Sequence, residues 1–384
     1  MTSPARRTLP RIGQIALEFS APDGDGEPPR EHLSCVVASA DGRTLWLASD
    51  ETATVERLIL SDEGTHFAAH ERVPLRDRLG LPGADDEEAD IEGLALHHGY
   101  LWVAGSHSLA RRRPKKADDA EAALSRLTNV KLEANRFLFG RIPLAKGDGN
   151  AAQLADKVKT DEGGKLRAGR LSIAEKQKHL KAAATRSALS AAVCADEHFG
   201  PFMEVPAKEN GFDVEGIVVL DDRIFLGLRG PVLRGHATVL EIAVAEGKRG
   251  SLALAPVGED GAVYRKHFLG LDGLGIRSLM PHGDDILILA GPTMDLDGPV
   301  RIYRWRQAAS SSAPRAAGVY GGEDVAYLGD LPFGDGDDHA EGMTMLRLPG
   351  SSVAHLLVVY DGPAADRRRG AHGVLADLFA LPGS

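Results

Sequence analysis

The chain has 384 residues, of which 43% are hydrophobic and 26% charged, as is ordinary for a folded soluble protein. Lysine and arginine number 45 and aspartate and glutamate 55, so the formal net charge is −10 at pH 7. This acidity argues against general binding to nucleic acid or to an anionic membrane. No apolar run approaches the roughly 18 residues that span a bilayer. The N-terminus lacks the apolar region of a signal peptide, and two cysteines form no disulfide framework, so we expect a cytoplasmic protein.

One pattern recurs five times along the chain: an apolar strand, a polar turn rich in Gly, Asp or His, and a second apolar strand. This is the pattern of a β-hairpin. Three copies have the same length, because Glu92 and Ser106, Glu215 and Arg229, and Arg277 and Gly291 are each 14 residues apart. The five predicted hairpins occupy residues 32–51, 90–108, 213–231, 275–293 and 339–363.

Further strands follow each hairpin, and the strand predicted at residues 11–19 has no partner nearby in the sequence. Four strands per unit, with the N-terminal strand completing the last unit, is the pattern of a β-propeller closed by its ends. We therefore predict an all-β, single-domain propeller over residues 1–384. Five four-stranded blades are visible, and the irregular segment leaves room for a sixth. The additional predicted strands are 54–60, 66–75, 136–144, 237–244, 263–271, 299–305, 324–331 and 373–381.

Residues 112–205 interrupt this pattern. The segment follows the start of a basic run at 111–116, and its alanine-, lysine- and leucine-rich stretch at 171–193 predicts a helix. We interpret the segment as a mostly helical insertion within a blade. Insertions on one face of a repeat protein usually lie at its binding face, which predicts a protein partner here. The alternative is a helical cover for a blade edge, with no binding role.

The hairpins also predict where a site lies. In an antiparallel hairpin the start of the first strand lies beside the end of the second. If the first strands are innermost, these ends surround one mouth of the central channel, and the basic run 111–116 can reach the same mouth. Like charges that converge there repel one another unless a cation or protons neutralise them. The predicted ring comprises Ser34, Asp50, Glu51, Asp90, Glu92, Ser106, His107, Asp213, Glu215, Arg229, Arg277, His339, Glu341 and Asp361.

The carboxylates of this ring predict a cation site. Residues two apart on a strand point the same way, so Asp90 and Glu92 can face one site together. Hard oxygen ligands in this number suit Ca²⁺ or Mg²⁺ better than zinc. The alternative is that the glutamates accept backbone amide bonds from the next blade and only lock the propeller. The predicted metal ligands are Glu92, Glu215, Glu341 and Asp361.

Arginines replace the acidic residue at two ring positions. A guanidinium there either pairs with the carboxylates or clamps an anionic substrate. Arginines beside a hard metal suit a phosphate ester, because charge neutralisation is most of that catalysis. The predicted substrate-binding residues are Arg229, Arg277, Arg234 and Ser106. The predicted catalytic residues are His339, as general acid–base, and Asp50.

The segments DIEGLAL, DVEGIVV and HAEGMTM, with the loop ends ASDE, GLRGP and YDGP, resemble two related groups of proteins. The closer is a bacterial family designated domain of unknown function 3616, and the likeness covers nearly the whole chain. That resemblance implies a propeller and no established activity. The more distant is the esterase-like phytase group of propellers, which shares the Glu-Gly strand starts. It implies phosphoesterase activity, carried by Glu92, Glu215 and Glu341.

Two functional hypotheses follow. In the first, the protein is a divalent-metal-dependent hydrolase, or a binder, of a small anionic ligand such as a phosphorylated compound. In the second, it is a non-catalytic scaffold whose segment 112–205 docks a protein partner, while the acidic ring is purely structural.

Overall fold

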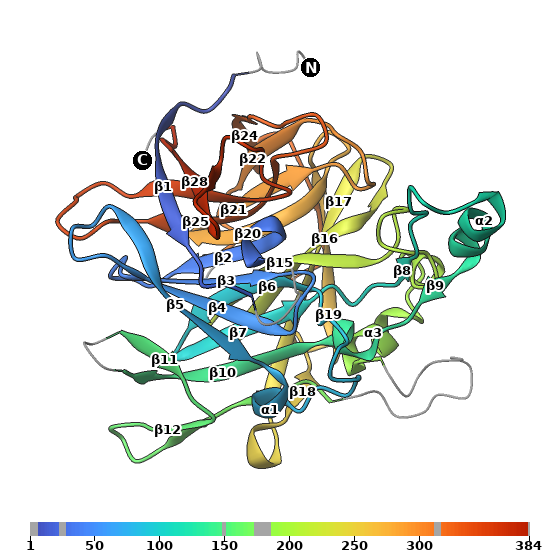
Figure 1. Ribbon diagram of the computed structural model, residues 1–384. Helices are drawn as coiled ribbons and strands as arrows, with labels where there is room; N and C mark the ends of the chain where they lie inside the picture. Colours follow the sequence, from blue (N-terminus) through green and yellow to red (C-terminus); the bar gives the residue numbers. More distant parts are fainter. Residues whose placement is uncertain (1–6, 23–27, 148–150, 173–185, 311–315, 383–384) are drawn as a thin grey trace.

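Each predicted hairpin forms the inner half of a β-sheet in the computed structural model, which describes residues 7–22, 28–147, 151–172, 186–310 and 316–382 (Figure 1). The strands within each hairpin are antiparallel. Most of their residues are buried and apolar, as expected for strands covered on both faces. The hairpins are β2 (Leu33–Ala38) with β3 (Thr44–Ser49), β6 (Ile91–His97) with β7 (Tyr100–Gly105), β15 (Asp213–Leu220) with β16 (Arg223–Leu233), β20 (Gly275–His282) with β21 (Asp285–Gly291), and β25 (His339–Leu346) with β26 (His355–Asp361).

Two outer strands complete each sheet, so the described residues form five four-stranded blades. Short strands extend some blades: β14 (Gly169–Arg170), β18 (Leu252–Ala255), β23 (Gly318–Tyr320) and β27 (Arg368–Arg369). From the first blade to the fifth, the outer pairs are β4 (Thr54–Leu60) and β5 (His66–Pro74), β10 (Phe139–Lys146) and β11 (Ala152–Leu154), β17 (His236–Glu246) and β19 (Tyr264–Gly270), β22 (Val300–Trp305) and β24 (Val325–Leu331), and β28 (Gly373–Phe379) and β1 (Arg11–Glu18).

The N-terminal strand closes the ring of blades, as predicted. β1 pairs antiparallel with β28 in the fifth blade, where Ile15 faces Ala376, and the two strands lie side by side in Figure 1. β1 also forms a short parallel pairing with β5 of the first blade. The innermost strands touch one another in the cyclic order β2, β6, β15, β20, β25 and back to β2. The propeller fold is therefore confirmed, and the described residues place five blades around its axis.

Apolar layers between neighbouring blades form the core. Trp46 of the first blade is fully buried and belongs to the same apolar cluster as Leu94 and Val103 of the second. The glycine that follows each ring glutamate permits this close packing. A Cβ atom on Gly216 would lie 2.9 Å from the backbone nitrogen of Leu279 in the next blade, a separation that real side chains essentially never show.

Residues 112–205 differ from the mostly helical insertion that the sequence predicts. Their described part contains helices α2 (Ala120–Thr128) and α3 (Ala188–Val193), and more of its residues lie in strands. Besides β10, β11 and β14, these are β9 (Val130–Lys131), which pairs with β8 (Ala110–Arg111), and the hairpin β12 (Lys157–Lys159) with β13 (Lys165–Arg167). The last six residues of the predicted helix 171–193 form α3, and residues 173–185 lie outside the described residues.

The two helices differ in their surroundings. Leu189 and Val193 of α3 are buried in the core between the second and third blades, so this helix covers the sheets. α2 buries none of its residues and lies at the edge of the molecule (Figure 1). In the described part of the chain, no helix is long and apolar enough to cross a membrane.

Candidate functional site

Each of the five innermost strands has a β-bulge at the equivalent position. In each inner hairpin the pairing register shifts across one residue near the start of the first strand. Such a residue falls outside the regular pairing of the ladder, and a bulge re-aims its side chain. The bulged residues are Ser34, Glu92, Glu215, Arg277 and Glu341, which are the five equivalent positions obtained by counting along the sequence.

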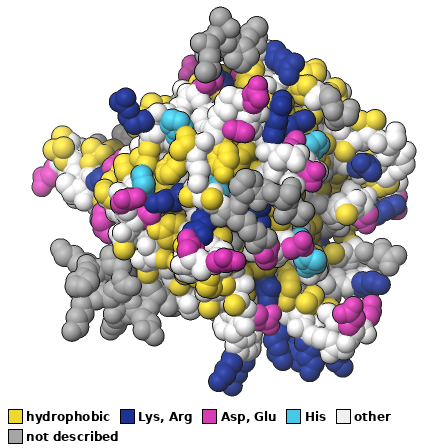
Figure 2. All heavy atoms as spheres, turned by 180° about the vertical axis from the view of Figure 1, so that it is seen from behind, with side chains coloured by type: hydrophobic (Ala, Val, Ile, Leu, Met, Phe, Trp, Pro, Cys, Tyr) yellow, Lys and Arg dark blue, Asp and Glu magenta, His cyan; other side chains and the backbone are white. Residues whose placement is uncertain are grey.

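These strand starts open onto a cavity of about 360 Å³. Its floor includes carboxylates from the first, second and fifth blades together with Arg229 of the third. Two other segments also line it: residues 109–114, which follow β7, and residues 206–209, which precede β15. On the surface face shown in Figure 2, by contrast, acidic and basic side chains are interspersed. The cavity is therefore a place where negative charge converges in a confined space.

Three of the carboxylates that line the cavity lie close together. One oxygen from each of Asp50, Asp90 and Glu92 can be chosen so that all three lie within 4.8 Å of one another. Glu92 is 8% exposed, and its side chain forms no hydrogen bond or ion pair with any described residue. One oxygen of Asp50, Oδ1, is buried without a hydrogen-bond partner. Two of the three side chains thus retain unused acceptor capacity toward one point.

These carboxylates tend to hold protons, because their pKa values are raised. Burial raises the pKa of Glu92 well above its ordinary value, and the neighbouring Glu215 and Asp90 raise it further. Burial also raises the pKa of Asp50, together with the charges of Glu341 and Asp90. A divalent cation would remove the same repulsion by a different route, so protons and a cation compete for this site.

The other ring glutamates are paired with arginines. Arg229 lies 2.6 Å from Asp213 and 2.8 Å from Glu215, measured between nitrogen and oxygen. Arg277 lies 2.6 Å from Glu341 and 3.5 Å from Glu215. Burial still raises the pKa of Glu215 to about 8, although both arginines lower it. Glu215 and Glu341, two of the four predicted metal ligands, are therefore engaged in a buried chain of ion pairs.

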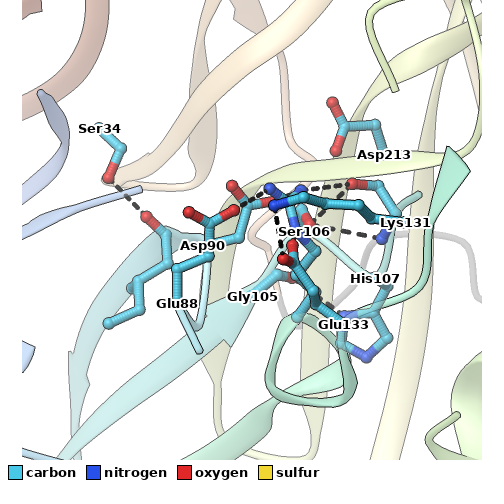
Figure 3. A network of polar contacts seen from close by, with 12 residues as sticks. Ser34, Glu88, Asp90, Gly105, Ser106, His107, Lys131, Glu133 and Asp213 are labelled. Carbon is cyan, nitrogen blue, oxygen red and sulfur yellow. Dashed lines mark hydrogen bonds and ion pairs between the residues drawn. The ribbon is translucent and has the colours of Figure 1, made fainter. Parts of the chain in front are cut away.

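Arg136 is a functional neighbour that the sequence analysis missed. It lies in a short 3-10 helix, Ala134–Phe137, just before β10. Its guanidinium pairs with Asp90 at 2.5 Å, with Glu133 at 3.0 Å and with Glu88. Figure 3 shows these three acidic side chains converging on one point. Arg136 thus anchors Asp90 at the edge of the carboxylate group, and its place in an irregular segment gave no periodic signal.

Basic side chains also line the cavity. The predicted approach of the basic run is confirmed for Arg111, Arg112 and Arg113, which line it together with Lys208. Arg111 pairs with Glu209. Arg112 and Lys208 form no side-chain ion pair with any described residue, so two cations face the cavity without a fixed anionic partner. Lys208 precedes the third hairpin by several residues, and no motif marked it.

The negative floor acts on Lys208 from a distance. Burial and the charge of Arg229 lower its pKa, but the charges of Asp295, Glu341 and Asp50 outweigh them and the pKa is raised. Lys208 therefore remains a cation at neutral pH, and it lines the same cavity as the carboxylates.

The remaining predicted residues lie at different distances from this cavity. Asp361 lines it and pairs with His32 at 3.3 Å, and this contact lowers its pKa although burial opposes the shift. His339 pairs with Asp297 at 3.1 Å and lines a smaller adjoining cavity of about 40 Å³, which also touches Lys208.

Three predicted substrate-binding residues do not line the main cavity: Ser106, Arg234 and Arg277, the last of which lines the adjoining cavity instead. Ser106 is fully buried and accepts a hydrogen bond from Ser108 at 2.8 Å. Arg234 is exposed in the turn between β16 and β17. The structure thus brings together Asp50, Glu92, Arg229, Glu341 and Asp361, with Arg277 engaged behind them.

The family model described as "Protein of unknown function (DUF3616)" matches residues 32–377, so the chain belongs to this family. A search of curated proteins returned no match.

The chain is also similar to solved structures at low identity. The β-propeller domain of Cps50 (Swd1) from Myceliophteria thermophila is 10% identical, with 98% of this chain and 100% of that chain covered and a TM-score of 0.33. An exo-1,5-alpha-L-arabinanase from a bovine ruminal metagenomic library is 8% identical, with 92% and 94% covered and a TM-score of 0.37. Drosophila Semaphorin 1b, extracellular domains 1–2, is 7% identical, with 97% and 88% covered and a TM-score of 0.38. Likenesses of this degree carry no argument about the site.

Proposed function

We propose that this protein binds a divalent cation, Ca²⁺ or Mg²⁺, through Asp50, Asp90 and Glu92, and holds a small anionic ligand above it. The observation that carries the proposal is Glu92, a nine-tenths buried carboxylate that pairs with none of the described residues and lines a cavity beside two other carboxylates. An isolated buried charge is costly unless it is paired or coordinates a metal. The proposed cation meets that requirement.

The donor set fits a hard cation. Carboxylate oxygens at about 2.3–2.6 Å are the usual ligands of Ca²⁺, and adjacent ligands in such a shell lie roughly 3.3–3.7 Å apart. Oxygens already within 4.8 Å of one another need only small side-chain movements to reach that spacing. The three side chains come from the end of the first hairpin and the start of the second, on a scaffold of buried strands. Arg136 keeps Asp90 in place.

The basic residues that line the cavity suggest the ligand. Arg112 and Lys208 face the same space as the carboxylates, and neither has a fixed anionic partner in the described part of the chain. An anion between the cation and these side chains would be neutralised from both sides. A phosphate group suits this arrangement, because it has several acceptor oxygens and binds both hard cations and basic side chains.

A finer proposal concerns catalysis. A bound divalent cation stabilises negative charge on a phosphoryl group and acidifies water. Lys208 would neutralise charge that develops on the phosphate, and His339, in the adjoining cavity, is the proposed proton donor or acceptor. The resemblance of Glu92, Glu215 and Glu341 to the Glu-Gly starts of esterase-like phytases also supports phosphoester hydrolysis.

The proposal is tested by calorimetric titration of EDTA-treated protein with CaCl₂ and MgCl₂, in the wild type, Glu92→Gln and Asp50→Asn. The matched control is Glu63→Gln, which makes the same change on an exposed glutamate in the turn between β4 and β5. We expect saturable binding in the wild type and control, and its loss in both site variants. Equal binding in all four proteins, or none in the wild type, would overturn the proposal. A positive result justifies a screen of phosphate esters.

A second candidate function is supported by a separate observation. Leu124, Leu127 and Val130, in and just after α2, are 66%, 46% and 40% exposed. Apolar side chains grouped on an exposed helix are typical of a docking surface. If the wild type binds neither cation nor phosphate, while Leu124→Asp abolishes binding of a protein partner cross-linked to α2, the scaffold hypothesis replaces the cation proposal.

A further inference from the structure

A second group of metal-ligating side chains lies at the other end of the inner strands. His97 is the last residue of β6, and His98 begins the turn to β7. Asp221 begins the turn between β15 and β16, in the next blade. Glu92 and Glu215 lie near the starts of the same two strands, about 15–20 Å away at roughly 3.3 Å per residue. The histidines and the aspartate therefore lie near the channel mouth opposite the carboxylate site.

The three side chains converge on one point. The Nε2 atom of His98 lies 2.9 Å from Oδ1 of Asp221, and Nε2 of His97 lies 3.7 Å from the same oxygen. One ligand atom from each residue can be chosen so that all three lie within 4.8 Å of one another. The two imidazole rings have centroids 4.0 Å apart and are nearly perpendicular. Their nitrogens thus approach the carboxylate from different directions, as ligands of one ion must.

The backbone fixes this arrangement. His97 pairs with Tyr100 across the hairpin, so the connection consists of His98 and Gly99 alone. Both have positive φ, at 46° and 74°, as a tight type I′ turn requires. On the other blade, Leu220 pairs with Arg223, which makes Asp221 part of an equally short turn. Each ligand is therefore attached to a short, hydrogen-bonded hairpin.

An unused nitrogen points to a ligand. Nε2 of His97 is buried and has no hydrogen-bond partner, although this histidine lies beside a carboxylate. A buried polar atom without a partner is uncommon in a folded protein. The hydrogen bond between His98 and Asp221 leaves Nε2 of His97 without a partner. A metal ion at the centre of the group would bind one atom from each of the three residues.

The donor set selects a transition metal. Two imidazoles and one carboxylate are common ligands of zinc, whereas Ca²⁺ and Mg²⁺ prefer oxygen ligands. With zinc bonds of about 2.0–2.2 Å, neighbouring ligand atoms of a tetrahedral site lie roughly 3.3–3.5 Å apart. The observed separations of 2.9 Å and 3.7 Å lie on either side of that value. Three protein ligands leave a fourth position for water or an external donor.

We propose that His97, His98 and Asp221 form a zinc site at this second mouth, supplied by two neighbouring blades. The site is independent of the carboxylate group, because its ligands, its chemistry and its place on the strands all differ. Zinc bound there bridges β6 and β15, and so stabilises the contact between the second and third blades.

The test is calorimetric titration of EDTA-treated, full-length protein with ZnCl₂. Wild-type protein is compared with His98→Asn, Asp221→Asn and a control, His355→Asn, which changes a histidine at the equivalent hairpin end of the fifth blade. We expect one equivalent of zinc binding to be lost in both site variants and retained in the control. His98 and Asp221 are exposed, so metal-free melting temperatures close to that of the wild type should show that both variants fold.

A further comparison separates the two proposed sites. Asp50→Asn/Glu92→Gln should keep the zinc binding that His98→Asn removes, and His98→Asn should keep the calcium or magnesium binding. Zinc titrations of His98→Asn and Asp221→Asn that match the wild type would overturn the zinc site, as would loss of zinc binding in the carboxylate variant alone.

Discussion

Replacing Glu92 by glutamine should stabilise the cation-free protein, although it removes a buried side-chain charge. Two full charges 4.8 Å apart repel by about 3.5 kcal/mol at an effective dielectric constant of ~20. Asp50 and Asp90 both lie within that distance of Glu92. Because the pKa values of Glu92 and Asp50 are raised, bound protons remove part of this repulsion in the folded protein. We therefore expect Glu92→Gln to gain roughly the value of one pair, ~3 kcal/mol.

This gain in the free energy of unfolding can be measured as an increase in melting temperature. At ~2.1 cal/mol/K per residue, the unfolding entropy of 384 residues is roughly 0.8 kcal/mol/K, so ~3 kcal/mol corresponds to an increase of about 4 °C. Thermal melts in EDTA at pH 8 measure it, with Glu63→Gln as the exposed control. Calcium at 1,000 times its Kd should reverse the order, since it stabilises the wild type by about 4.1 kcal/mol, more than the ~3 kcal/mol gained by the variant.

The pH dependence has a definite sign. A carboxyl group with a raised pKa keeps its proton in the folded protein at pH values where the unfolded chain has lost it. The free energy of unfolding therefore falls as pH rises from the ordinary carboxyl pKa through the raised value. For Glu215 that window extends from 4.5 to about 8. In EDTA the wild type should lose stability between pH 5 and 8, and Glu92→Gln should lose less. A lower melting temperature for Glu92→Gln at pH 8 in EDTA would refute this reasoning.

Three further outcomes are expected. Arg277→Met leaves two buried glutamates without their shared cation and should lower the free energy of unfolding, measured in urea, by about 3–5 kcal/mol. An unchanged urea midpoint would show that the ring does not need this arginine. Gly216→Ala forces a Cβ against the next blade and should cost roughly 1–3 kcal/mol, whereas Gly321→Ala, with nothing within 4 Å, serves as a control that should cost little. Lys208→Ala should weaken inorganic phosphate binding by calorimetry in the presence of calcium while calcium affinity stays near the wild-type value; unchanged phosphate affinity would place the anion elsewhere.

The structure of the repeated part of the molecule could be predicted from the sequence because its units have similar lengths and patterns. The constant spacing from Glu92 to Ser106 and from Glu215 to Arg229 predicted both the hairpins and the ring of equivalent positions. The β1 strand was assigned to the last blade because residues 11–19 had no local partner, and its pairing with β28 confirms that assignment.

What the sequence could not show depends on irregular segments and on pairing between side chains. Lys208 and Arg136 lie in segments without periodicity, so only the folded chain brings them to the cavity. The sequence also left open whether Arg229 and Arg277 hold a ligand or pair with carboxylates, since both choices use the same residues. Their distances to Glu215 show that they pair within the ring.

The bulges have a consequence for how such a site can change. Each bulged side chain falls outside the regular pairing of its strand, so the sheet places little demand on its identity. The five equivalent positions accordingly hold a serine, three glutamates and an arginine on one unchanged scaffold. The five positions around the axis can thus carry different side chains on the same backbone. Substitutions there can alter the charge and ligand preference of the mouth one position at a time, while the apolar layers between the blades continue to hold the fold.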